Sequence, residues 1–170
     1  MAQISTEVLG DERGTLLAFV EAQRAALRES VLGLTDEQAA SRPSASELSL
    51  SGLLKHAAEV ELNWLRLAQQ RPSERQRTAE TWGESFRLVD DESIPSVLAF
   101  WAGVSEELED FLRTLPSLDE VFPLPPAPWF PQDAKVSMRW MLLHLVEEYA
   151  RHAGHADIVR ETIDGTKAMG

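Results

Sequence analysis

The segment Arg139-Trp-Met-Leu-Leu-His144-Leu-Val-Glu-Glu148-Tyr-Ala-Arg-His152-Ala-Gly-His155 carries the strongest structural signal in the chain. Its apolar residues recur at intervals of three and four, as they do on one face of an α-helix. At 100° per residue, Glu148 and His152 lie about 40° and 80° around the helix from His144, within the arc of the apolar residues. The pattern predicts a long helix over residues 137–163 with polar side chains on its core-facing side.

The same periodicity predicts further helices, while strand signals are nearly absent. Long helices are expected over residues 11–34, 49–70 and 93–115, and a short helical turn is expected to begin at Thr35. With the last helix, these segments predict an all-α four-helix bundle with two long connections. Neither an internal repeat nor a change of composition marks a boundary, so residues 1–170 are expected to form a single domain.

The two connections are expected to pack on the bundle through a few apolar side chains. In the first connection, residues 71–91, these are Trp82, Phe86 and Leu88. In the second, five of the nine prolines lie in the segment 122–131, which excludes a continuous helix. This proline-rich segment is either a rigid loop over one end of the bundle or a wall of the binding site to which Trp129 contributes.

The composition excludes several classes of protein. Sixteen Lys and Arg residues against 28 Asp and Glu residues give a net charge of -12, which opposes binding to nucleic acids and to anionic membranes. The chain contains no cysteine, so it has no disulfide, thiolate ligand or catalytic thiol. The first residues lack the pattern of a signal peptide, and no apolar run is long enough to cross a membrane. A cytoplasmic location is therefore expected.

Histidines on the apolar faces of two predicted helices are candidate metal ligands. His56 lies on the apolar face of the second long helix, and Trp64 lies two turns further along near the same face. Glu148 and His152 are one turn apart on the last helix, and a buried carboxylate is costly unless it is paired, protonated or bound to a metal. The three residues provide a two-His, one-carboxylate metal site inside a bundle. From spacing alone, a buried Glu–His hydrogen bond and a solvent-exposed ion pair remain alternatives.

Two segments, residues 49–64 and 139–165, resemble the DinB-like superfamily of proposed metalloenzymes. More narrowly, they are similar to its actinobacterial branch, which includes mycothiol-dependent S-transferases, and to the metal domain of mycothiol-dependent maleylpyruvate isomerase. The resemblance covers most of the chain. It implies a four-helix bundle whose helices run in the order up-down-down-up.

The resemblance also implies roles for individual residues. It assigns the metal ligands to His56, Glu148 and His152, with Glu148 in place of the third histidine of many DinB-like proteins. His155 stands where many members have glutamine, and it is expected beside the metal or the substrate without being a ligand. His144, one turn before Glu148, is also expected near the site without binding the metal. Trp64 and Trp129 are expected there for another reason, namely the helix spacing from His56 and the position of the proline-rich segment before the last helix.

The family further implies a divalent metal, zinc or nickel, and a thiol cosubstrate, mycothiol. Such a metal stabilises a thiolate, which attacks an electrophilic carbon. The leading hypothesis is therefore a metal-dependent S-transferase that joins mycothiol to an electrophilic small molecule. The alternatives are a metal-dependent hydrolase, a metal-binding protein without catalytic activity, and a helical interaction protein without a metal. The oligomeric state is open, with a homodimer as one alternative.

Overall fold

Four long helices make up most of the structure, a computed structural model that describes residues 11–127 and 130–168. The long helices are α1 (Glu12–Glu29), α3 (Leu50–Ala68), α4 (Ile94–Thr114) and α5 (Met138–Asp164). The short elements are α2 (Asp36–Ala40), the 3-10 helix η1 (Trp82–Phe86) and the strands β1 (Val121–Pro123) and β2 (Lys135–Ser137). The predicted all-α fold is confirmed, and every long helix begins one residue after its predicted start.

The helices begin where the sequence predicts because a capping side chain marks each start. Ser49, Ser93 and Ser137 each accept a hydrogen bond from a backbone N–H of the helical turn that follows. Thr35 and Gln38 form a reciprocal capping box at the start of α2. Caps of this kind stabilise a helix by about 1 kcal/mol each, since they satisfy N–H groups that the helix itself leaves unpaired.

Helix α1 ends at Glu29, whereas the apolar spacing predicted a helix up to Leu34. The chain leaves the helix axis in a turn that contains Gly33, whose φ of 75° is readily adopted only by glycine. Val31 stays buried in this turn although it is no longer helical. Apolar spacing thus predicted which residue is buried, but it did not locate the end of the helix.

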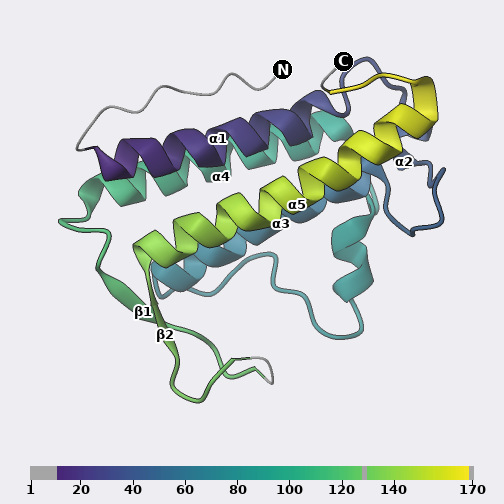
Figure 1. Cartoon of the computed structure of the whole chain (residues 1–170). Coiled ribbons are helices and arrows are strands. Elements are labelled where there is room, and N and C mark those ends of the chain that lie inside the picture. Colours follow the sequence, from purple (N-terminus) through teal and green to yellow (C-terminus); the bar gives the residue numbers. More distant parts are fainter. Residues whose placement is uncertain (1–10, 128–129, 169–170) are drawn as a thin grey trace.

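The four long helices run in the order up-down-down-up. Helices α1 and α5 point in one direction, and α3 and α4 point in the other (Figure 1). Helix α3 packs against both α4 and α5, and α1 packs against α5. Because α3 and α4 are parallel, the connection between them must return along the bundle, and it places η1 against α3.

The second long connection contains a two-stranded antiparallel hairpin, which the sequence did not predict. Strand β1 pairs with β2 so that Phe122 lies opposite Val136. Phe122 is buried, and its ring contacts Trp64 of α3 edge-on. The proline-rich segment 122–131 begins in β1 and leads toward β2. Trp129 lies outside the described residues, so its expected role in a wall of the site stays a prediction.

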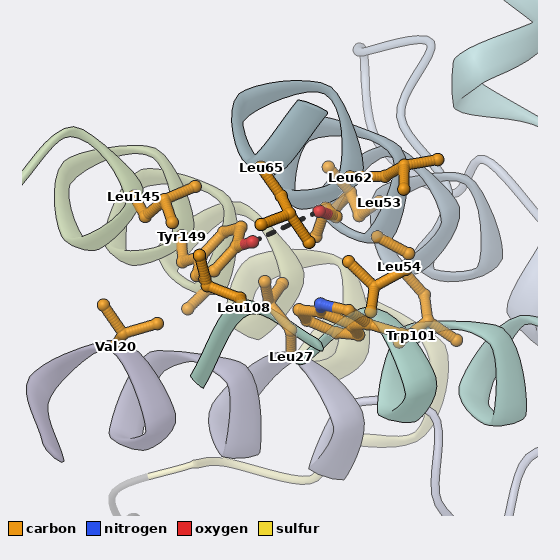
Figure 2. Close-up of a cluster of buried hydrophobic side chains, with 14 of the residues drawn as sticks. Val20, Leu27, Leu53, Leu54, Leu62, Leu65, Trp101, Leu108, Leu145 and Tyr149 are labelled. Atoms are coloured by element: carbon orange, nitrogen blue, oxygen red, sulfur yellow. Dashed lines mark hydrogen bonds between the residues drawn. The ribbon is translucent and has the colours of Figure 1, made fainter. Parts of the chain in front are cut away.

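The core lies between the four long helices, where apolar side chains pack together (Figure 2). It also contains a buried network of polar groups. Arg24 of α1 donates hydrogen bonds of 3.0 and 2.6 Å to the carboxylate of Glu61 in α3. The indole N–H of Trp101 in α4 and the hydroxyl of Tyr149 in α5 donate to the same carboxylate at 2.8 and 2.7 Å. A buried charge requires such partners. The network therefore joins one residue from each long helix.

No helix among the described residues combines the length and the apolar composition that a membrane-spanning helix requires.

Candidate metal centre

Three side chains from α3 and α5 converge at the edge of the core. The Nε2 atoms of His56 and His152 each lie 3.2 Å from Oε1 of Glu148. Potential ligand atoms of all three side chains lie within 4.8 Å of one another. The two imidazole rings meet edge-on, with their centroids 4.9 Å apart. The sequence prediction that His56, Glu148 and His152 share a core-facing position therefore agrees with the geometry.

The packing of α3 against α5 brings these side chains together. His56 lies on the buried face of α3, and Glu148 and His152 lie one turn apart on the face of α5 that meets it. The side chains of His56 and His152 are 5% and 10% exposed, and that of Glu148 is 17% exposed. The cluster is therefore largely shielded from water, yet it is reachable from solvent on the side of the carboxylate.

The electrostatics of the cluster favour an ionised carboxylate. Hydrogen bonds from His152 and His56 hold the pKa of Glu148 well below its usual range, although partial burial acts in the opposite direction. An ionised carboxylate and neutral imidazoles are the forms in which these side chains bind a metal.

The second ring nitrogen of His56 contacts η1, a segment in which the sequence predicted no site residue. Nδ1 of His56 lies 3.1 Å from Oγ of Ser85. The ring of Phe86 stacks on the His56 ring with their centroids 4.1 Å apart. Ser85 lies 29 positions from His56, in a polar connection, and no spacing rule relates them. The stacked Phe86 agrees with its predicted role as an apolar contact of this connection.

The second ring nitrogen of His152 contacts another histidine. Nδ1 of His152 lies 3.4 Å from Nδ1 of His155, and the two rings meet at an angle. His155 therefore lies beside the cluster, where the sequence predicted it, and it does not belong to the group of three candidate ligands.

His144 and Trp64, two of the remaining predicted site residues, form an aromatic group with Trp140 next to the cluster. His144 lies one turn before Glu148 on α5, stacks on Trp140 and contacts Trp64 of α3 edge-on. Burial lowers the pKa of His144. Trp140 is 39% exposed, so this aromatic group reaches the molecular surface. His144 and Trp64 contact each other, and neither belongs to the group of three candidate ligands.

The donor set of the cluster fits a divalent metal. Two imidazole nitrogens and one carboxylate suit zinc, nickel, iron or manganese, and three protein ligands leave positions for a further molecule. In metal sites, the histidine nitrogen that does not bind the metal is normally held by a hydrogen bond. Ser85 and His155 stand at these two positions.

The fold and its cluster define the class of the protein as a four-helix bundle with a candidate two-histidine, one-carboxylate metal site. The family model described as mycothiol S-transferase matches residues 15–165, and the chain belongs to this family. Among solved structures, the chain is similar to a conserved protein from Enterococcus faecalis, with a TM-score of 0.70 and 14% sequence identity. That likeness covers 91% of this chain and 98% of the other. No curated protein matches the chain.

Proposed function

We propose that the protein is a metal-dependent S-transferase that joins a low-molecular-weight thiol, mycothiol, to an electrophilic small molecule. The observation that carries the proposal is the His56, Glu148 and His152 cluster, which lies inside the segment matched by the mycothiol S-transferase family. The chain has no cysteine, so the sulfur nucleophile has to come from a small molecule. The cluster is accessible beside Glu148, where such a molecule is expected to enter.

The residues of the chain have distinct tasks in this reaction. In the proposed mechanism, His56, Glu148 and His152 hold the metal, which is zinc or nickel. Ser85 and His155 orient the imidazoles of the two histidine ligands. The bound metal supplies the positive charge that lowers the pKa of a thiol. Burial of the two histidines limits competing water. The sulfur then forms a bond to an electrophilic carbon while the bond from that carbon to its leaving group breaks. The leaving group departs with the electron pair, and the thiol proton passes to solvent.

The experiment compares two neighbouring glutamates of α5. Glu148→Gln removes the charge of a proposed ligand, whereas Glu147→Gln makes the same change at an exposed side chain that pairs with Arg151. Untagged proteins are analysed for bound metal, loaded with zinc or nickel, and supplied with mycothiol, bacillithiol or glutathione and a model electrophile. Mass spectrometry then detects the conjugate.

We expect wild type and Glu147→Gln to bind one metal and to form the mycothiol conjugate. Glu148→Gln should lose both properties. Conjugation by metal-free protein, or equal activity of the two variants, contradicts the proposal. A product that carries the elements of water instead of the thiol supports the hydrolase alternative, in which the same cluster activates water.

A further inference from the structure

We propose that Ser85 is a positioning residue, which holds the imidazole of His56 with Nε2 directed toward Glu148. Oγ of Ser85 lies 3.1 Å from Nδ1 of His56, and both residues are only 4% exposed. Ser85 is thus the polar neighbour of a buried ring nitrogen that would otherwise lack a partner. The inference rests on the proposed function, because it concerns a ligand of the proposed metal centre.

A hydroxyl suits this position because it both donates and accepts hydrogen bonds. When Nε2 of His56 is free to bind a metal, Nδ1 carries the proton and donates a hydrogen bond to Oγ of Ser85. When Nε2 carries the proton and donates to Glu148, the Ser85 hydroxyl donates to Nδ1 instead. Ser85 therefore holds the ring in the same orientation in both tautomers.

The position of Ser85 is set by the contact between η1 and α3. A Cβ atom at Gly52 would lie 2.0 Å from the backbone oxygen of Phe86, so the two backbones approach as closely as glycine permits. Gly52 lies one turn before His56 on α3. The ring of Phe86 covers the face of the His56 ring while Ser85 contacts its edge. Two successive residues of η1 thus restrict the imidazole in two directions.

Buried ion pairs hold the connection against α3 on both sides of η1. Lys55 of α3 donates to the backbone oxygen of Arg87 at 3.0 Å and to Glu92 at 2.5 Å. Before η1, Arg77 donates to both carboxylate oxygens of Glu59 in α3, at 3.1 and 2.5 Å. The side chains of Lys55 and Glu59 are each 3% exposed, so these ion pairs are shielded from water. The connection therefore holds Ser85 in place by contacts that involve none of the three candidate ligands.

The test compares Ser85→Ala with Ser105→Ala. Ser105 of α4 is also buried and accepts a hydrogen bond, from Arg28, but it contacts none of the candidate ligands. We expect Ser85→Ala to weaken zinc affinity by about 10- to 100-fold, the usual effect of removing such a partner. Ser105→Ala should bind zinc as wild type does. Affinity is measured by competition with a chelator, and circular dichroism verifies that each variant is folded.

A second measurement uses the metal-free protein, so that it does not depend on the proposed function. Nitrogen NMR of the histidine side chains should report a changed tautomer balance in Ser85→Ala, with the largest shift at Nδ1 of His56. In Ser105→Ala the His56 signals should remain in place. If wild type binds no zinc but the His56 signals respond to Ser85→Ala, the proposed function fails and the positioning role stands. Unchanged signals together with unchanged zinc affinity overturn the positioning role.

Discussion

Phe86 and Trp82 both belong to the short helix η1, but they differ in how closely they pack against the bundle. Phe86 is partly buried and stacks on His56, whereas Trp82 is 58% exposed and only approaches His56 edge-on, with centroids 6.4 Å apart. The sequence predicted both as contacts that pack the connection on the bundle. The prediction holds for Phe86 and is wrong for Trp82, because apolar character alone does not decide which side of a single helical turn faces the core.

At the residue scale, we therefore expect opposite results from truncating these two side chains. Phe86→Ala removes a ring from between η1 and α3 and should lower the free energy of unfolding by about 2 kcal/mol, less than a fully buried phenylalanine would lose. Trp82→Ala should change it by less than about 0.5 kcal/mol. Urea unfolding of the two variants provides the measurement, and equal losses would contradict the orientation of η1.

The candidate ligands and the neighbouring His155 could be predicted from the sequence, but the contact of Ser85 with His56 could not. Glu148 and His152 lie one turn apart on a helix whose phase follows from its apolar residues. His56 lies on an equally clear apolar face. Ser85, in contrast, reaches His56 only because a polar connection folds back over α3, and a serine in such a segment carries no signal of burial.

At the scale of elements, the close approach of η1 to α3 depends on a helix residue without a side chain. Glycine normally weakens the interior of a helix. At Gly52 the absence of Cβ instead permits direct backbone contact with Phe86. A Cβ atom at Gly103 of α4 would meet no neighbouring atom within 4 Å, so this glycine offers a matched comparison.

We expect alanine to have opposite effects at these two glycines. Gly52→Ala should displace η1 and lower the free energy of unfolding by about 1–3 kcal/mol, as overpacking does. Gly103→Ala should raise it by up to about 1 kcal/mol, because alanine is the better helix former. Thermal and urea unfolding distinguish the two. A Gly52→Ala variant as stable as Gly103→Ala would mean that η1 moves freely away from α3.

Helices were the elements that the sequence predicted well, since each has a capping residue and a long apolar face. The hairpin was missed because its strands have only three residues each, too few for an alternating pattern to stand out. Its pairing brings together Phe122 and Val136 across a proline-rich segment, and such a contact depends on how the chain returns to the bundle.

At the scale of the whole molecule, the carboxylate of Glu61 connects all four long helices. Its partners Arg24, Trp101 and Tyr149 lie between 37 and 88 residues away in the chain, so local spacing could not reveal the network. Arg24 and Glu61 have fully buried side chains. Removing the Arg24 charge leaves the buried Glu61 carboxylate without its opposite charge, which typically costs about 3–5 kcal/mol. Arg24 itself also pairs with Glu21 and Glu109, so it keeps acidic partners when Glu61 is removed.

The network predicts how stability depends on alkaline pH. Burial and the adjacent Glu61 carboxylate raise the pKa of Tyr149 well above its usual value of 10. Above pH 10 the unfolded chain therefore releases a proton that the folded protein retains, and stability falls by about 1.4 kcal/mol per pH unit from this residue. In Tyr149→Phe, the free energy of unfolding should not show this part of the decrease above pH 10.

The chain contains one tyrosine, so tyrosinate absorbance reports on Tyr149 alone. We expect no tyrosinate signal in the folded protein as the pH passes 10, and its appearance only as the protein unfolds. Urea unfolding of wild type and Tyr149→Phe below and above pH 10 measures the accompanying change in stability. A tyrosinate signal near pH 10 with the fold intact would contradict the buried position of this hydroxyl.

The up-down-down-up order also has a consequence for how the protein is made. His56 precedes Glu148 by 92 residues, so the ribosome completes α3, both long connections and α4 before it begins to add α5. Until α5 docks against α3, the nascent chain presents His56 without the other two members of its cluster. We therefore expect any metal to bind at the cluster only after α5 has docked against α3. The supply of metal in the cell should therefore limit the fraction of protein molecules that carry a metal. It should not limit the number of molecules that reach the folded state.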